Sequence, residues 1–268
     1  TRKVTTTMGM FGYCSSLTLL DLSHFYTDSL NDTSYMFYGC SNLTSVNLIN
    51  FDTSLVTDMR YMYNGCINLN SINLSNFITS NVTNMEGMFC NCKSLTTLNL
   101  SHLDTSNVQS MKKMFMNCIS LQILNISNFK TSNVLDMEDM FNGCTALSSL
   151  DLSSFNTTSV SNIKTMFKQC NNLNSLNLSN FNTININNTY GVFSYCTNLK
   201  LIDVSNFDTS KVTNMEGMFY GLRQINHISL SNFNTSLVTS MNSLFYGCDS
   251  LISIDISNFN RSEEHTSE

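Results

Sequence analysis

Residues 79–104, TSNVTNMEGMFCNCKSLTTLNLSHLD, decide the fold, because close copies of this stretch follow one another along the chain at a spacing of 26 residues. One threonine per copy marks the period without exception: Thr1, Thr27, Thr53, Thr79, Thr105, Thr131, Thr157, Thr183, Thr209 and Thr235. Cysteine marks it too, at Cys14, Cys40, Cys66, Cys92, Cys118, Cys144, Cys170, Cys196 and Cys248, with Leu222 at the one missing step. Ten units occupy residues 1–260, and we expect them to stack as one solenoid, so that each position of the unit forms a column along the axis.

The first half of the unit carries a helix-like spacing of apolar residues. In residues 79–104 these are Val82, Met85, Met88, Phe89 and Cys92. Steps of three and four place them on one face of a short helix or 3₁₀ turn. Asn84 is a suitable N-cap for this element, and Gly39 and Gly65 in sister units lie near its other end.

The second half of the unit has the alternation of a strand. Leu95, Leu98 and Leu100 follow the pattern Leu-x-x-Leu-x-Leu, and Thr97 and Asn99 alternate with the last two. This predicts a short, half-buried strand that pairs in parallel with the same strand of the next coil, about 4.8 Å away. The fold class is therefore an α/β repeat solenoid of leucine-rich-repeat type, each coil combining a short parallel strand with a short helix or 3₁₀ turn.

The unit also resembles a known family. Its pattern Met-Phe-x-Gly-Cys-x-x-Leu-x-x-Leu-x-Leu-Ser-x-Phe-x-Thr-Ser-x-Val is similar to the BspA-like surface leucine-rich repeats, especially their 26-residue Met-Phe-x-Gly-Cys-x-x-Leu subtype, seen in bacterial surface lipoproteins. In one unit the match consists of Met36, Phe37, Gly39, Cys40, Leu43, Val46, Leu48, Phe51, Thr53, Ser54 and Val56. The resemblance implies a cell-surface or secreted solenoid for adhesion or protein interaction, with no catalytic residues to transfer. Phe51, Phe77, Phe129 and Phe181 stand where the general leucine-rich consensus has Asn or Cys, so we do not expect a tight horseshoe.

Composition excludes some partners. Charged residues make up 12% of the 268-residue chain, about half the usual share, and the net charge is −6. This surface offers no basic patch to nucleic acid or an anionic membrane, and no apolar run is long enough for a membrane span.

The last eight residues, 261–268, read RSEEHTSE and match no unit. We interpret them as a non-native tail that looks like read-through of a sequencing adapter, and the array 1–260 as a fragment of a longer one. Uncapped terminal coils of such a fragment expose strand edges, so self-association is expected.

The columns separate reactive groups instead of gathering them. The cysteine column could form disulfides between coils, but we favour a row of buried thiols, with the off-register Cys90 exposed. His24 and His102 lie three coils apart, and Asp151 and Asp203 two coils apart, too far for a shared catalytic or metal site. We therefore expect no enzyme, no cofactor and no metal.

The outward face of the strand column is the candidate binding site. Its polar residues are Asn47, Asn73, Asn99, Asn125, Asp151, Asn177 and Asp203, flanked by Ser75, Ser101 and Ser127. Such an extended face suits a protein or glycan on another cell or matrix surface, although an exposed strand must be polar in any case. The alternative is a ligand-templating surface for polysaccharide or ice. For the invariant threonines we expect a structural hydroxyl-to-backbone bond at a turn.

Overall fold

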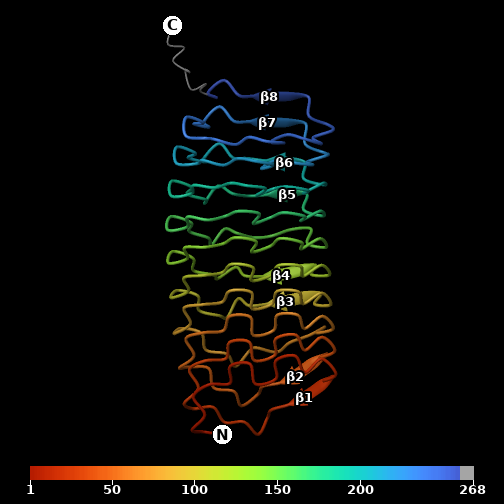
Figure 1. Ribbon diagram of the computed structural model, residues 1–268, viewed down its shortest axis with the longest axis vertical. Coiled ribbons are helices and arrows are strands. Elements are labelled where there is room, and N and C mark those ends of the chain that lie inside the picture. The colour runs from red at the N-terminus through yellow and green to blue at the C-terminus, as the bar shows by residue number, and fades with distance from the viewer. Residues whose placement is uncertain (260–268) are drawn as a thin grey trace.

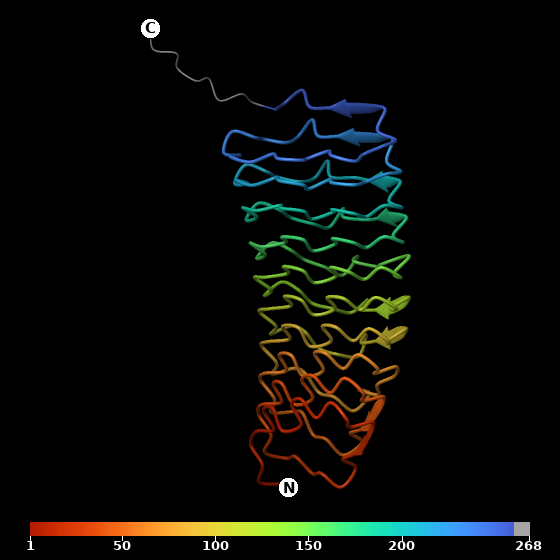
Figure 2. The ribbon, with the colours of Figure 1, turned by 45° about the vertical axis from the view of Figure 1, so that its right-hand side comes forward.

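Flat coils of one repeat unit each stack into a straight column in the computed structural model, which describes residues 1–259 (Figure 1). Figures 1 and 2, which differ by a 45° rotation, both show a straight stack without the curvature of a horseshoe. Residues 261–268, which we interpret as a non-native tail, lie outside the described residues. No described helix is long and apolar enough to cross a membrane.

Short parallel strands pair between neighbouring coils with a register of one period. They are β1 (Leu19–Asp21), β2 (Ser45–Asn47), β3 (Thr97–Asn99), β4 (Ile123–Asn125), β5 (Ser175–Leu176), β6 (Leu201–Ile202), β7 (His227–Ser229) and β8 (Ser253–Asp255). They form four two-stranded sheets, β1–β2, β3–β4, β5–β6 and β7–β8, and in β3–β4 the partners are Leu98 and Leu124, 26 residues apart. A second line of parallel bridges links successive coils from Thr6 to Ser240. The predicted parallel pairing in columns is confirmed.

The predicted helix or 3₁₀ turn is wrong, because residues 1–259 contain no helix. Gly87 and Asn91 have φ of +57° and +60°, in the left-handed region, which an α-helix cannot accommodate. Instead, backbone N–H groups alternate in their partners: Met88 donates within its own coil to the Met85 carbonyl at 3.3 Å, and Phe89 donates to the next coil. Two successive tight turns thus bring Met88 and Phe89 inward with the spacing that a helix would also give.

The expected capping residues take part in these turns. Asn84 Oδ1 accepts the Glu86 N–H at 2.9 Å, as an N-cap would, but no helix follows. Gly39 and Gly65 have φ of +71° and +75°, so they serve as left-handed turn residues and not as helix C-caps.

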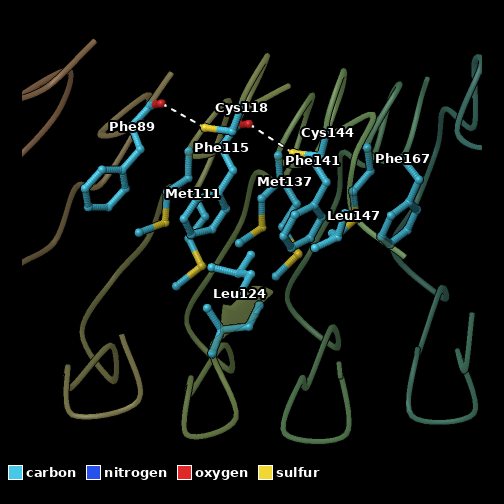
Figure 3. Packing of buried hydrophobic residues seen from close by; sticks show 14 of the residues in the cluster. Phe89, Met111, Phe115, Cys118, Leu124, Met137, Phe141, Cys144, Leu147 and Phe167 are labelled. Carbon is cyan, nitrogen blue, oxygen red and sulfur yellow. Dashed lines mark hydrogen bonds between the residues drawn. The ribbon is translucent and has the colours of Figure 1, made fainter. Parts of the chain in front are cut away.

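The core is a set of columns that run the length of the stack. The rings of Phe89, Phe115, Phe141 and Phe167 lie one behind another in Figure 3, with centroids 5.6–5.9 Å apart and nearly parallel planes. Methionine and leucine side chains fill the space beside the rings (Figure 3). Phe129 is 1% exposed, so the phenylalanine that departs from the leucine-rich consensus extends the core. Since one unit cannot bury these side chains alone, stability comes from stacking.

Candidate functional site

The predicted binding residues lie along one outward side of the stack, on the strand segments and the residues just after them; we call this side the strand face. Asn47, Asn73, Asn99, Asp151, Asn177, Asp203, Ser75 and Ser127 are exposed, and Asn125 and Ser101 are partly exposed. The structure brings neighbouring coils together here, pairing Asn99 with Asn125 across β3 and β4. Their role in binding stays a prediction.

The asparagine and aspartate side chains of this column also have a local structural role. Asn99 Oδ1 accepts the Ser101 N–H at 3.1 Å, and Asp151 Oδ1 accepts the Ser153 N–H at 2.9 Å. This is an Asx turn, in which the side chain imitates a backbone turn and redirects the chain after the strand. One oxygen of each side chain is therefore engaged within the coil.

Carboxylates keep this face negative in its second half, where Asp151, Asp203 and Asp255 share the strand column. Hydrogen bonds from the side chain and backbone of Ser153 lower the pKa of Asp151, and the equivalent bonds from Ser205 lower the pKa of Asp203. Both groups are thus ionised at neutral pH, and the strand face can accept hydrogen bonds or bind a cation-bearing partner there.

Within the strands, three large apolar side chains interrupt the polar strand face, which the sequence interpretation missed, and a fourth, Ile49, replaces serine in the flanking column and is 66% exposed. Leu19, Ile123 and Leu201 are 67%, 63% and 68% exposed. The other coils have serine or threonine at this position, for example Ser175, except for one with His227. The signal was present in the sequence: at each of these three sites two apolar residues are adjacent, which breaks the strand alternation.

The invariant threonines join neighbouring coils, as structural residues. Thr131 Oγ1 donates at 2.8 Å to the carbonyl of Asn156, which ends the same unit one full turn further along the stack, and accepts the Asn156 N–H, also at 2.8 Å. Thr53 makes the same pair of bonds to Ile78. The expected hydroxyl-to-backbone bond is confirmed, and its partner lies one turn further along the stack.

The cysteines of the column are free thiols. Each inner thiol donates to a carbonyl of the preceding coil; Cys118 Sγ, for example, lies 3.1 Å from the Phe89 oxygen, as Figure 3 shows. Burial raises the pKa of the Cys144 thiol to about 12, so this thiol is neutral at physiological pH. The prediction that Cys90 is exposed is wrong: it is 4% exposed, and Asn91 Nδ2 donates to its Sγ at 3.2 Å.

Reactive groups do not converge on a metal site. The described part of the chain holds no group of three or more His, Cys, Asp or Glu residues that could bind a metal ion. His102 Nε2 lies 2.8 Å from the Leu74 carbonyl, and His227 Nδ1 lies 2.8 Å from Ser253 Oγ. These histidines are thus separate and engaged with neighbouring coils.

Comparison with known families identifies the repeat. Residues 5–122, 96–200 and 187–268 match the family described as Mycoplasma protein of unknown function, DUF285. The chain belongs to this family. The match supports the resemblance to BspA-like leucine-rich repeats at family level, and the 26-residue subtype stays a prediction. No curated protein matches the chain.

Among solved structures, this DUF285 chain is similar to a leucine-rich cell surface protein from Faecalibacterium prausnitzii A2-165, with 18% identity, a TM-score of 0.34, and coverage of 92% of this chain and 80% of the other. A leucine-rich repeat protein from Bacteroides ovatus gives 16% identity and a TM-score of 0.30, with 94% and 82% coverage. The TLR13–ssRNA13 complex gives 15% identity and a TM-score of 0.35, with 97% and 43% coverage.

Proposed function

We propose that the chain is a non-catalytic scaffold of the cell surface or of a secreted protein, and that it binds a partner protein through its strand face. The observation that carries the proposal is the set of exposed apolar side chains, Leu19, Ile123 and Leu201, among hydrogen-bonding groups. Protein interfaces combine apolar anchors of this kind with polar surroundings. The surface location rests on the resemblance of the repeat to BspA-like proteins.

The column geometry favours binding over catalysis. A side chain and its copies are separated by whole coils along the axis, so polar groups form lines and do not converge on one reacting atom. An extended partner can contact several coils at once, so that the binding free energies of several weak contacts sum. Isolated leucines and isoleucines on this face are unsuited to templating ice or a regular polysaccharide, which need an uninterrupted ladder.

The proposal is tested by removing the apolar anchors. The double variant Ile123→Ser, Leu201→Ser gives these positions the residue found in sister coils, so the fold should be kept. Retention of the chain on immobilised matrix proteins and on epithelial cells is expected to fall at least about tenfold, since each buried anchor contributes roughly 1.5–3 kcal/mol.

The matched control is Leu55→Asn, Leu135→Thr, which removes exposed leucines away from the strand face, again in favour of sister-coil residues. This variant should bind like the unchanged chain. Equal retention of both double variants would show that the strand face is not the binding surface.

A further inference from the structure

A tyrosine that packs over a glycine of the next coil provides an internal template for a binding site. We call the side formed by the eighth, ninth, twelfth and thirteenth residues of each unit the turn face. On it, the ring of Tyr61 lies over Gly87: a β-carbon added to Gly87 would meet the ring at 2.3 Å. The Tyr61 hydroxyl donates to the Glu86 carboxylate at 2.6 Å. A glycine floor and a carboxylate acceptor thus hold a phenol, through a charge-assisted hydrogen bond.

The same floor and acceptor recur five units further along the chain, where the tyrosine is replaced by glycine. Five periods after Tyr61, Glu86 and Gly87 stand Gly191, Glu216 and Gly217. No ring covers Gly217, since the nearest atom to an added β-carbon is Tyr220 Cβ, at 3.7 Å. Glu216 is partly exposed, and in the described chain its carboxylate accepts a hydrogen bond from Ser240 Oγ at 3.4 Å. An acceptor is therefore available where the template has a bound hydroxyl.

A cavity of about 280 Å³ lies over these two glycines. Tyr190, Tyr195 and Tyr220 form aromatic parts of its wall, and Ser194 and Lys168 add polar groups. A cavity with aromatic walls and a few polar groups suits a ligand that is both apolar and hydrogen-bonding, as a phenol is.

We propose that this cavity, the phenol site, binds a tyrosine side chain of a partner protein, with its ring over Gly217 and its hydroxyl donating to Glu216. The most exposed tyrosines of the chain already pack on neighbours of their own: Tyr13 on Tyr38, Tyr26 against Arg2, and Tyr246 on Tyr220. Within one chain these tyrosines are engaged elsewhere and no ring covers Gly217, so we assign the occupant to a partner protein and leave a second copy as an outcome of the test. The phenol site lies on the turn face and does not depend on binding at the strand face.

The first test is a titration of the full chain with N-acetyltyrosinamide, followed by NMR. A dissociation constant of about 1 mM is expected for a ligand of this size. N-acetylphenylalaninamide should bind at least about tenfold more weakly, because it cannot donate to Glu216, and the variant Glu216→Ala should lose a similar factor for the tyrosine probe.

A second test fills the site from within. Gly191→Tyr recreates the arrangement of Tyr61, and it should fold, since Tyr35 and Tyr61 adopt φ of 58° and 55° at this position and Gly191 has 57°. Binding of the probe should be abolished. The matched control Lys113→Tyr introduces a tyrosine at the same position three units away, and it should leave binding unchanged.

The reciprocal variant, Tyr61→Gly, uncovers the floor at Gly87 beside Glu86, so the number of bound probes should rise from one to two. Equal binding of the two probes, or unchanged binding to Gly191→Tyr, would overturn the phenol site. Sedimentation gives a further check: if the unchanged chain self-associates and Gly191→Tyr is monomeric, the occupant is a second copy, and the assignment to another protein is wrong. None of these readouts involves Ile123 or Leu201, so failure of the strand-face proposal would be seen separately.

Discussion

Replacing one invariant threonine by valine should cost far more stability than its size suggests. Thr131 is 1% exposed, and its hydroxyl provides the two bonds recorded for the Asn156 backbone, one to the carbonyl and one from the N–H. Valine has nearly the same shape, so Thr131→Val leaves no cavity but deprives two backbone groups of their partner. An unsatisfied buried group costs about 1–3 kcal/mol, and because this turn is only part-buried we expect a total loss of about 2–4 kcal/mol.

The assay is urea unfolding together with native-state hydrogen exchange, since a repeat array can open locally. Thr131→Ser is the matched control: it keeps the hydroxyl and loses one methyl group, which costs about 1 kcal/mol. In Thr131→Val the Asn156 amide should exchange much faster, and in Thr131→Ser it should stay protected. If the valine variant is as stable as the serine variant, the threonine column is not held by its hydroxyl.

Three further predictions follow from the core and the backbone. Tyr63 stands in the phenylalanine column with a buried hydroxyl that has no partner in the described chain, so Tyr63→Phe should raise the free energy of unfolding by about 1–2 kcal/mol in urea titrations; a loss would show that the hydroxyl is satisfied. Burial raises the pKa of the Cys144 and Cys196 thiols to about 12, against about 8.5 in an unfolded chain. The stability that the neutral thiols contribute is therefore present below about pH 8.5 and is lost as pH rises toward 12. The free energy of unfolding should fall by about 1.4 kcal/mol per pH unit for each thiol. Cys144→Leu, which copies Leu222, should make urea unfolding less sensitive to alkaline pH, and an unchanged pH slope would contradict the burial argument. Far-ultraviolet circular dichroism should lack the double minimum of α-helix, and a strong helical spectrum would contradict the turn-built first half of the unit.

The period alone predicted the stack, its register and its core columns, because each of these depends only on which residues recur 26 positions apart. The helix was predicted wrongly for a physical reason: Met85, Met88 and Cys92 have a spacing that helices and successive tight turns both satisfy. The left-handed conformation of Gly87 and Asn91 decides between them. Glycine or asparagine recurs at the position of Asn91, and that signal was assigned to a helix end, whereas the glycines at the position of Gly87 were not interpreted.

The candidate site was predictable in position and less so in character. Strand alternation placed Asn99 and its counterparts outward, as the structure does. The Asx-turn bond to Ser101 was not foreseen, because it depends on how the chain turns after the strand and not on which residues face solvent. The phenol site could not be predicted from the sequence. It follows from the position of the Tyr61 ring over Gly87, which shows what the glycine five units further along leaves uncovered.

The hydrogen bonds between coils have a consequence for how such a gene can change length. Thr131 reaches Asn156, and Cys118 reaches Phe89, so each residue depends on the neighbouring coil and on nothing more distant. Removing or duplicating one whole period in the interior would leave every remaining coil with neighbours of the same kind. Unequal recombination between the repeats of the gene would thus shorten or lengthen the rod by complete turns without unfolding it, and would vary how far it reaches.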